Sequence, residues 1–145
     1  MVIGEVHLAR IGFFVGEHFQ SHEIVFDRVL MEEMPVEKIT VAVKGHPIIN
    51  DATIEDVKTT GIANMVKVIV NGSDAPGTIL DLCSVKFRKA FDDADLIIAK
   101  GQGNYETLSS VCKNIFFLFK AKCPVISRHI GTDIGNIVIT RNRNV

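Results

Sequence analysis

The sequence predicts an α/β fold in which helices cover both faces of a mostly parallel sheet. Short apolar, β-prone runs alternate along the chain with segments whose apolar residues recur at helical spacing. This alternation is typical of parallel strands, because each crossover between them takes up a helix. The 145 residues show no repeat, low-complexity tract or linker, so residues 1–145 are expected to form one domain.

The elements follow from local patterns. Residues 96–99 are an unbroken apolar run between polar neighbours, as in a strand buried on both faces. Pro35 is expected to end the first helix and Gly61 the second, for which Asp51 or Thr53 is the candidate cap. The expected strands are residues 11–15, 38–43, 65–70, 96–99, 114–119 and 137–140, with a short extended piece at 125–126. The expected helices are residues 23–34, 53–60, 84–91 and 104–109.

Composition narrows the class of protein. The formal net charge of −1 gives no indication of a nucleic-acid groove or of attraction to an anionic membrane. No apolar run reaches the roughly 20 residues of a membrane span, and no secretion signal is recognisable, so a cytoplasmic protein is expected. Cys83, Cys112 and Cys123 form no Cys-x-x-Cys pair, which favours three reduced thiols over a zinc site or disulfide framework.

The segment around Lys100 is the clearest candidate site. Lys100 follows the apolar run at 96–99, and Gly101 and Gly103 come directly after it. Ligands of open α/β sheets bind beyond the carboxyl ends of strands, where glycines let backbone N–H groups approach an anion and a lysine adds positive charge. A cradle for phosphate or carboxylate is one interpretation, and a surface loop with an ordinary lysine is the other.

Other polar residues follow the remaining strands, and parallel strands bring them to one edge. They are residues 17–23, Asn50 with Asp51, Ser73 with Asp74, residues 100–104, and Lys120. Carboxylate and amide oxygens suit Mg²⁺ or Mn²⁺, and lysines suit phosphate oxygens, so the set points to metal-assisted phosphoryl chemistry. Each residue also has a simpler interpretation: Asp51 as a helix cap, Ser73 and Asp74 as turn formers, and Lys120 as a solvated lysine.

Several segments resemble the damage-control phosphatase family, long known as a domain of unknown function. The block KGQGNYE, within residues 99–108, is the most specific of them. The similar segments are residues 23–30 (EIVFDRVL), 49–56 (INDATIED), 72–78 (GSDAPGT), 99–108 (AKGQGNYETL) and 117–125 (FLFKAKCPV). They occur in order from residue 23 towards the C-terminus, so the resemblance covers most of the chain.

The resemblance implies a metal-dependent phosphatase acting on small phosphorylated metabolites such as sugar phosphates. It also implies a three-layer α/β/α sandwich with a Rossmann-like sheet. Asp51 would ligate a divalent metal, Mn or Mg, with Ni or Co as further possibilities. Lys100 and Lys120 would act with Asp51 in catalysis. The implied substrate-binding residues are Glu23, Ser73, Asp74, Lys100, Gly101, Gln102, Gly103, Asn104 and Lys120.

Two departures from the family pattern stand out. Members usually carry a helical region before the catalytic domain, and this chain is expected to lack it. The family's first strand ends in Asp-Asn-Ala-Gly-Glu, whose Asp and Asn bind the metal. A gapless alignment back from Glu23 places Phe19 and Gln20 at those positions, and a shifted alignment places Glu17 and His18 there. Glu17, His18 and Gln20 are therefore the candidate additional metal ligands, and the stretch is hypothesised to be degenerate through a shifted reading frame or a truncated copy.

Two functions remain open from the sequence. An active phosphatase needs Asp51 and a divalent cation, whereas a catalytically degenerate phosphate-ligand-binding or assembly protein would keep the fold and the phosphate loop alone. A general nucleotide-binding domain is disfavoured, because the Gly-x-Gly pair lacks the third glycine of Gly-x-Gly-x-x-Gly. A small phosphorylated metabolite is the expected partner, and self-association into a homo-oligomer is a further expectation.

Overall fold

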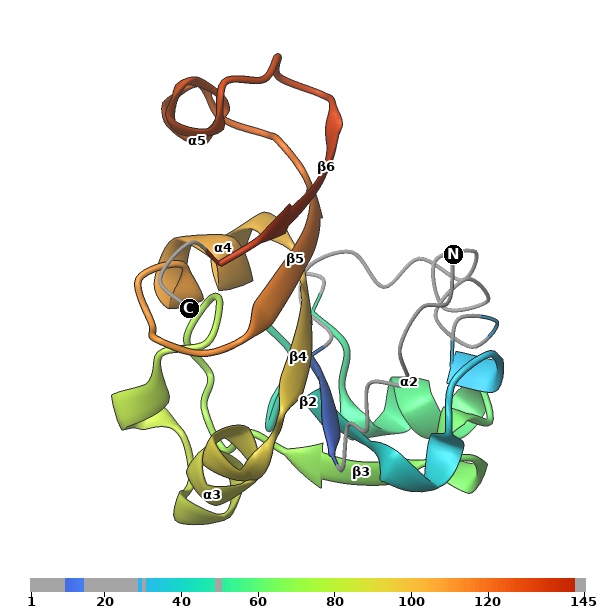
Figure 1. Ribbon diagram of the computed structural model, residues 1–145. Helices are drawn as coiled ribbons and strands as arrows, with labels where there is room; N and C mark the ends of the chain where they lie inside the picture. Colours follow the sequence, from blue (N-terminus) through green and yellow to red (C-terminus); the bar gives the residue numbers. More distant parts are fainter. Residues whose placement is uncertain (1–9, 15–28, 30, 49–50, 143–145) are drawn as a thin grey trace.

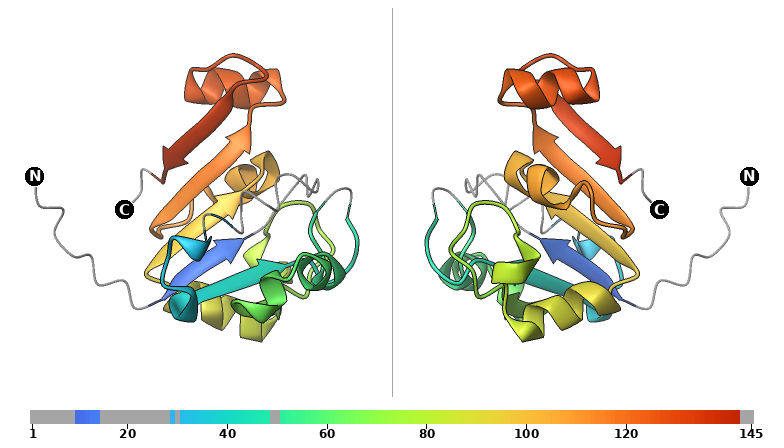
Figure 2. Two further views of the ribbon diagram at one scale, coloured as in Figure 1. Left: turned by 90° about the vertical axis from the view of Figure 1, so that its right-hand side faces the viewer. Right: turned by 90° about the vertical axis from the view of Figure 1, so that its left-hand side faces the viewer.

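The computed structural model describes residues 10–14, 29, 31–48 and 51–142, and these form one twisted sheet with helices on both sides (Figure 1). The strand order is β3-β2-β1-β4-β5-β6. Neighbouring strands are parallel except for β5 and β6, which are antiparallel (Figure 2). The strands are β1 (Ile11–Phe14), β2 (Ile39–Val43), β3 (Lys67–Val70), β4 (Leu96–Lys100), β5 (Ile115–Lys120) and β6 (Ile137–Arg141).

Local sequence explains where the helices begin and end. The Ser84 side chain accepts a hydrogen bond from the Phe87 N–H at the start of α3, and Thr53 precedes α2 with its N–H and hydroxyl both bonded to Asp56 Oδ2. Gly61 follows the second helix, as expected. The helices are α2 (Ile54–Thr59), α3 (Val85–Asp93), α4 (Gln102–Leu108) and α5 (Pro124–Ile130), with 3-10 turns η1 (Val36–Lys38), η2 (Ile62–Asn64) and η3 (Leu80–Leu82).

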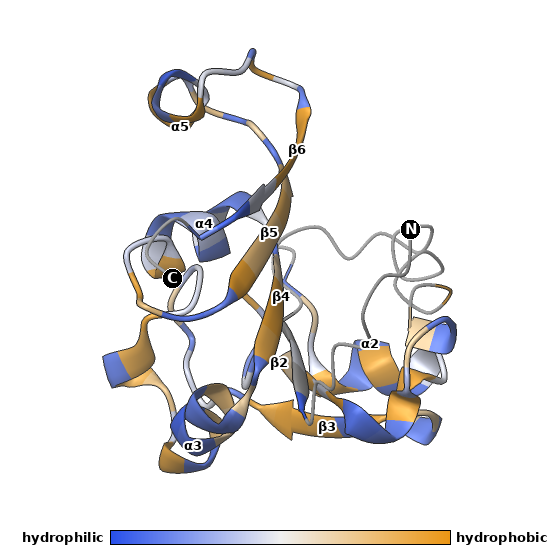
Figure 3. Ribbon diagram, in the orientation of Figure 1, coloured by the Kyte–Doolittle hydropathy of each residue, from blue (hydrophilic) through white to orange (hydrophobic). Residues whose placement is uncertain are grey.

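Each face of the sheet carries its own hydrophobic core. On one face α3 and α4 bury Phe87, Phe91 and Leu108 against the buried side of β4 and β5. On the other face α2 buries Val57 against β2, together with Met31. β4 and β5 are hydrophobic along most of their length, whereas α3 and α4 carry largely hydrophilic residues (Figure 3). These two cores confirm the expected α/β class with helices on both sides of a mostly parallel sheet.

Most of the expected elements are present, with two differences. Residues 125–126, expected as an extended piece, lie inside α5, so that prediction was wrong. Pro124 at the first helical position and Gly131 with φ 73 just after the last are the local signals that favour this helix. The last strand reverses direction, because α5 and the turn after it bring the chain back beside β5. Of the expected first helix, residues 29, 31 and 32 are helical, residues 33 and 34 form a turn and a bend, and residues 23–28 and 30 lie outside the described residues.

The topology of the sheet determines which of its edges is the candidate ligand-binding edge. Connections from β1 run to β2 and then β3 on one side, and β4 and β5 lie on the other side of β1. The carboxyl ends of β1 to β5 all lie on the same edge because these strands are parallel. Ligands of open α/β sheets bind at this edge, next to the point where the strand order reverses.

Candidate functional site

Lys44 and Asp51 form a buried ion pair at the carboxyl edge, directly after β2. Lys44 Nζ lies 3.6 Å from Asp51 Oδ2, and both side chains are at most 4% exposed. The Lys44 N–H donates to the Ala52 carbonyl at 2.9 Å, so the backbone at Ala52 lies beside the end of β2. Thr53, and not Asp51, precedes α2 as its cap, so the alternative interpretation of Asp51 as a helix cap is wrong.

The loop that follows β3 is tied to Lys44. The ammonium group of Lys44 donates to the Ala75 carbonyl at 2.5 Å and to the Gly77 carbonyl. Within the loop, the Ser73 N–H donates to Asn71 Oδ1 at 3.0 Å and the Ser73 hydroxyl accepts from the Ala75 N–H at 3.2 Å. Ser73 is therefore a buried turn former as well as a candidate site residue.

The same loop packs closely against α4. Gly77 has φ 68, and a Cβ atom there would lie 2.4 Å from the Gly103 carbonyl oxygen, so only glycine fits without a shift of backbone. The Thr78 N–H donates to Thr107 Oγ1 at 3.0 Å, and the Thr78 hydroxyl donates to Asn104 Oδ1 at 2.7 Å. The Asn104 amide then donates to the Lys100 carbonyl at 2.8 Å. Direct contacts thus run from Asp51 through Lys44 and this loop to the end of β4.

Gln102 extends the network to the end of β5. Its side-chain oxygen Oε1 accepts a hydrogen bond from the Lys122 backbone N–H at 2.7 Å, and its side-chain amide Nε2 donates to Glu106 Oε1 at 2.7 Å. The side chains of Gln102 and Asn104 are thus engaged in joining loops, whereas the resemblance implied that both bind substrate. Gly101, with φ 92, turns the chain from β4 into α4.

Lys100 and Lys120 end neighbouring parallel strands, and both lie at the edge that carries Asp51. Lys100 pairs in register with Leu118, two residues before Lys120. Alternation along a strand therefore puts Lys100, Leu118 and Lys120 on one face of the sheet. Lys120 is exposed and Lys100 is half-buried. The spatial expectation that an acid and two lysines share one edge of the sheet agrees with these positions.

The remaining predicted residues divide into two groups. Asp74 is exposed in the loop after β3, and Gly103 is buried in the first turn of α4. Glu17, His18, Gln20 and Glu23 lie outside the described residues. Among the described residues no group of three or more His, Cys, Asp or Glu is placed to hold a metal ion. Asp51 is thus the one predicted metal ligand whose position is described, and its carboxylate oxygens are of the type that Mg²⁺ and Mn²⁺ prefer.

Cys83 is poorly suited to act as a nucleophile at this edge. Burial raises the pKa of the Cys83 thiol, although the positive charges of Lys44 and Arg88 oppose the shift. A protonated, buried thiol is a poor nucleophile. Cys83, Cys112 and Cys123 form no disulfide with one another.

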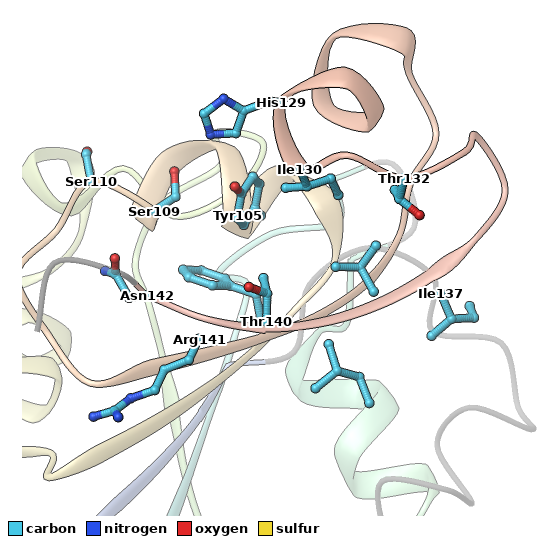
Figure 4. Close-up of a pocket in the computed structure, with 13 residues that line it drawn as sticks. Tyr105, Ser109, Ser110, His129, Ile130, Thr132, Ile137, Thr140, Arg141 and Asn142 are labelled. Carbon is cyan, nitrogen blue, oxygen red and sulfur yellow. The ribbon is translucent and has the colours of Figure 1, made fainter.

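A pocket of about 620 Å³ lies on the side of the sheet that α4 and α5 cover. Residues of α4, α5 and β6 surround it, with Tyr105 at its floor beside Phe117 (Figure 4). None of the predicted site residues that the structure describes lines it. The polar network at the carboxyl edge, and not this hollow, therefore gathers the groups suited to phosphate and metal chemistry.

Lys44 is the main residue that sequence reasoning missed. It follows an apolar strand and precedes a glycine, as Lys100 does. The same local signal was therefore present twice, but only the second case is followed by a Gly-x-Gly pair. Asn71 and Thr78, both buried at this edge, were also missed. The Thr78 hydroxyl bonds Asn104, 26 residues away in the sequence, whereas the Asn71 side chain bonds within its own loop.

The fold and this edge define an α/β protein with a buried acid and several lysines beyond the ends of parallel strands. Comparison with known proteins places it more narrowly. The sequence model described as the damage-control phosphatase ARMT1-like domain matches residues 21–138. The chain therefore belongs to the ARMT1-like damage-control phosphatase family, as the resemblance indicated.

Three archaeal relatives agree. An uncharacterised protein of Methanocaldococcus jannaschii, MJ0202, is 50% identical over 125 residues, which are 82% of this chain and 41% of the relative. Damage-control phosphatase PH1575 of Pyrococcus horikoshii is 46% identical over 133 residues, 89% of this chain and 44% of the relative. A damage-control phosphatase of Archaeoglobus fulgidus is 45% identical over 120 residues, 80% of this chain and 42% of the relative.

A solved structure supports the same placement. The crystal structure described as a DUF89 family protein, PH1575 from Pyrococcus horikoshii, superposes with a TM-score of 0.85 at 42% identity. The match covers 94% of this chain and 48% of that one. The chain thus spans less than half the length of the relatives it matches. Within the described part of the chain, no helix combines the length and hydrophobicity that a membrane span needs.

Proposed function

We propose that this chain acts as a metal-dependent phosphatase on small phosphorylated metabolites such as sugar phosphates. One observation carries the proposal: a continuous series of contacts joins Asp51 to the end of β4, where Lys100 stands, along the carboxyl edge of the sheet. Family membership supports it, since two of the relatives are named damage-control phosphatases.

Asp51 would hold the divalent cation, Mn²⁺ or Mg²⁺, with Glu17, His18 or Gln20 as further ligands. Its carboxylate is the donor type that hard cations select, which is the basis for the fit. When bound, such a cation supplies polarisation of the phosphoryl group and activation of a water. Lys44 compensates the buried charge of Asp51 at 3.6 Å in the protein as described.

The two strand-end lysines would hold the phosphate. Lys100 and Lys120 offer full positive charges to the phosphate oxygens, which stabilises negative charge that develops during transfer to water. Gln102 joins the segment after Lys100 to the segment after Lys120, because its side chain accepts a hydrogen bond from the Lys122 N–H. Asn104 holds the carbonyl of Lys100 in the same way. Their role on this proposal is to orient the lysines, not to react.

The direct test is phosphate release from a panel of sugar phosphates in the presence of Mn²⁺. Asp51→Ala is expected to reduce release by at least about 100-fold, as removal of one essential electrostatic group does. Asp92→Ala is the matched control, because Asp92 is an exposed acid of α3 away from the carboxyl edge. Equal release by the protein and by Asp51→Ala would reject the proposal.

The same protein separates turnover from binding alone. Isothermal titration with a non-hydrolysed sugar phosphate, with and without Mn²⁺, tests whether ligand binding needs the metal. A phosphatase is expected to bind its ligand more weakly without Mn²⁺ and to release phosphate with it. Metal-independent binding with no release would instead indicate a phosphate-ligand-binding protein.

A further inference from the structure

Lys44 is an unusual cation for its surroundings. The residue is 3% exposed, yet lysine is almost never fully buried unless it is paired. Its ammonium group has three N–H donors. Two of them serve the Ala75 and Gly77 carbonyls, and Asp51 Oδ2 lies at 3.6 Å. The group therefore joins two separate loops, the one after β2 and the one after β3.

Fold stability alone does not account for this arrangement. A small cavity of about 10 Å³ beside Lys44 is lined by apolar Ala42, Val43 and Phe87 and by polar Asn71, Thr78 and Asn104, so apolar side chains make up half of its other lining. Replacing a buried ion pair by apolar side chains of similar volume is often neutral or stabilising. A pair retained in such a place points to a requirement on geometry.

We propose that Lys44 is a positioning residue of the metal site. Its ammonium group fixes the Asp51 carboxylate against the loop after β3, and that loop is fixed in turn to α4 by Gly77 and Thr78. The metal-binding acid, Asp51, and the phosphate-binding lysine, Lys100, are thereby held in a fixed position relative to each other. This inference rests on the proposed function, because it assigns Lys44 a purpose only if Asp51 binds a cation.

The sign of the effect separates positioning from simple electrostatics. A positive charge 3.6 Å from a metal-binding carboxylate repels a cation, so charge alone predicts that removing Lys44 tightens metal binding. Positioning predicts the reverse, because Asp51 then loses its fixed orientation. The measured direction of the change in Mn²⁺ affinity therefore decides between the two.

The experiment is isothermal titration of Mn²⁺ into the full chain and its variants. Lys44→Met is expected to weaken Mn²⁺ binding at least tenfold, whereas Lys44→Arg, which keeps charge and donors, is expected to stay within about threefold. Ile115→Ala is the control for lost stability. Ile115 is fully buried at the start of β5, on the opposite edge of the sheet, so its loss should leave Mn²⁺ affinity unchanged. If Lys44→Met does not fold, Lys44→Gln replaces it with the same expectation of weaker binding.

Each outcome is decisive. Weaker binding by the neutral variants, with Lys44→Arg and Ile115→Ala near the parent, supports the inference. Tighter or unchanged binding by Lys44→Met or Lys44→Gln overturns it while leaving the proposed function intact. If the parent protein binds no Mn²⁺, the proposed function fails and the inference fails with it.

Discussion

Two Lys-Gly turns leave the same edge of the sheet, and their fates differ. Lys44-Gly45 follows β2 and Lys100-Gly101 follows β4, each after an apolar run. Lys44 turns inward to two carbonyls and an acid, whereas Lys100 is half-buried beside the first turn of α4. The backbone differs too, since Gly101 has φ 92 and leads directly into a helix.

The difference shows how neighbours assign a role to a lysine. Where Asp51 and two backbone carbonyls surround the ammonium group, as at Lys44, the lysine joins two loops inside the protein. Where the next residues open a helix at the sheet edge, the lysine is half-buried, and the proposed function assigns it to phosphate. A lysine after a buried strand therefore indicates a residue at the carboxyl edge of the sheet. The groups that surround its ammonium group decide whether it has a structural role or binds a ligand.

The largest expected effect would test this division through stability. Lys44→Met is expected to lower the free energy of unfolding by about 3–5 kcal/mol, because it leaves a buried carboxylate without its cation. Lys100→Met is expected to change it by no more than about 1 kcal/mol while reducing phosphate release. Urea unfolding of both variants measures the contrast. Equal losses of stability would break the comparison.

The next effect concerns the loop that Lys44 holds. Gly77→Ala is expected to cost about 3 kcal/mol, from left-handed backbone strain and from a clash with the Gly103 carbonyl. Gly131→Ala is the matched control, since its φ is 73 but nothing lies within 4 Å of the added Cβ. It should show the strain alone, about 1–2 kcal/mol. Thermal unfolding curves that coincide would show that the close approach to α4 adds nothing.

A smaller effect is expected where the loop meets the turn of Lys100. Asn104→Ala leaves the Thr78 hydroxyl and the Lys100 carbonyl without this partner, which should cost about 1–3 kcal/mol. The KM for a sugar phosphate should also rise, because Lys100 is held less firmly. Asn136→Ala, an exposed asparagine bonded to Thr132, provides the comparison for both stability and kinetics. If the KM of Asn104→Ala equals that of Asn136→Ala, Asn104 has no role in the site.

The smallest effect is expected at exposed positions of β6, the edge strand of the sheet. Ile137 and Ile139 are 74% and 72% exposed. Ile137→Thr and Ile139→Thr should change the free energy of unfolding by no more than about 0.5 kcal/mol and leave Mn²⁺ binding unaltered. Light scattering of the same variants tests the expectation of self-association, because an apolar edge strand is a surface on which copies pair. A parent protein that is monomeric at all concentrations would contradict that expectation.

The elements of the sheet were predictable because their signals are local. Apolar runs such as residues 96–99 and 115–119 mark strands regardless of what packs on them. Residues 125–126 misled because two apolar residues are too short a run to distinguish strand from helix, and the flanking Pro124 and Gly131 carried the better signal. The reversal of β6 has no local signal, since antiparallel pairing depends on the path of the preceding connection.

The site was predictable only as far as strand ends reveal it. Asp51, Lys100 and Lys120 were chosen as candidates because each lies at or after the end of an expected strand, and the topology brings them to one edge. Lys44 and Thr78 were missed because the groups that they bond lie 31 to 33 and 26 residues away in the sequence. The sequence also did not reveal that the side chains of Gln102 and Asn104 bond to other parts of the protein. Whether an amide binds a ligand or another loop depends on groups such as the Lys122 N–H that no local pattern shows.

The reversed course of β6 has a practical consequence for experiments on this chain. Arg141 pairs with Phe116 near the start of β5, so the chain after β6 departs from the rim opposite Lys100 and Lys120. A fluorophore or surface-immobilisation handle attached to exposed Arg141 would hence lie at the edge of the sheet opposite Lys100 and Lys120. Attachment there should leave solvent access to the lysines unobstructed, which makes it the preferred anchor for binding assays.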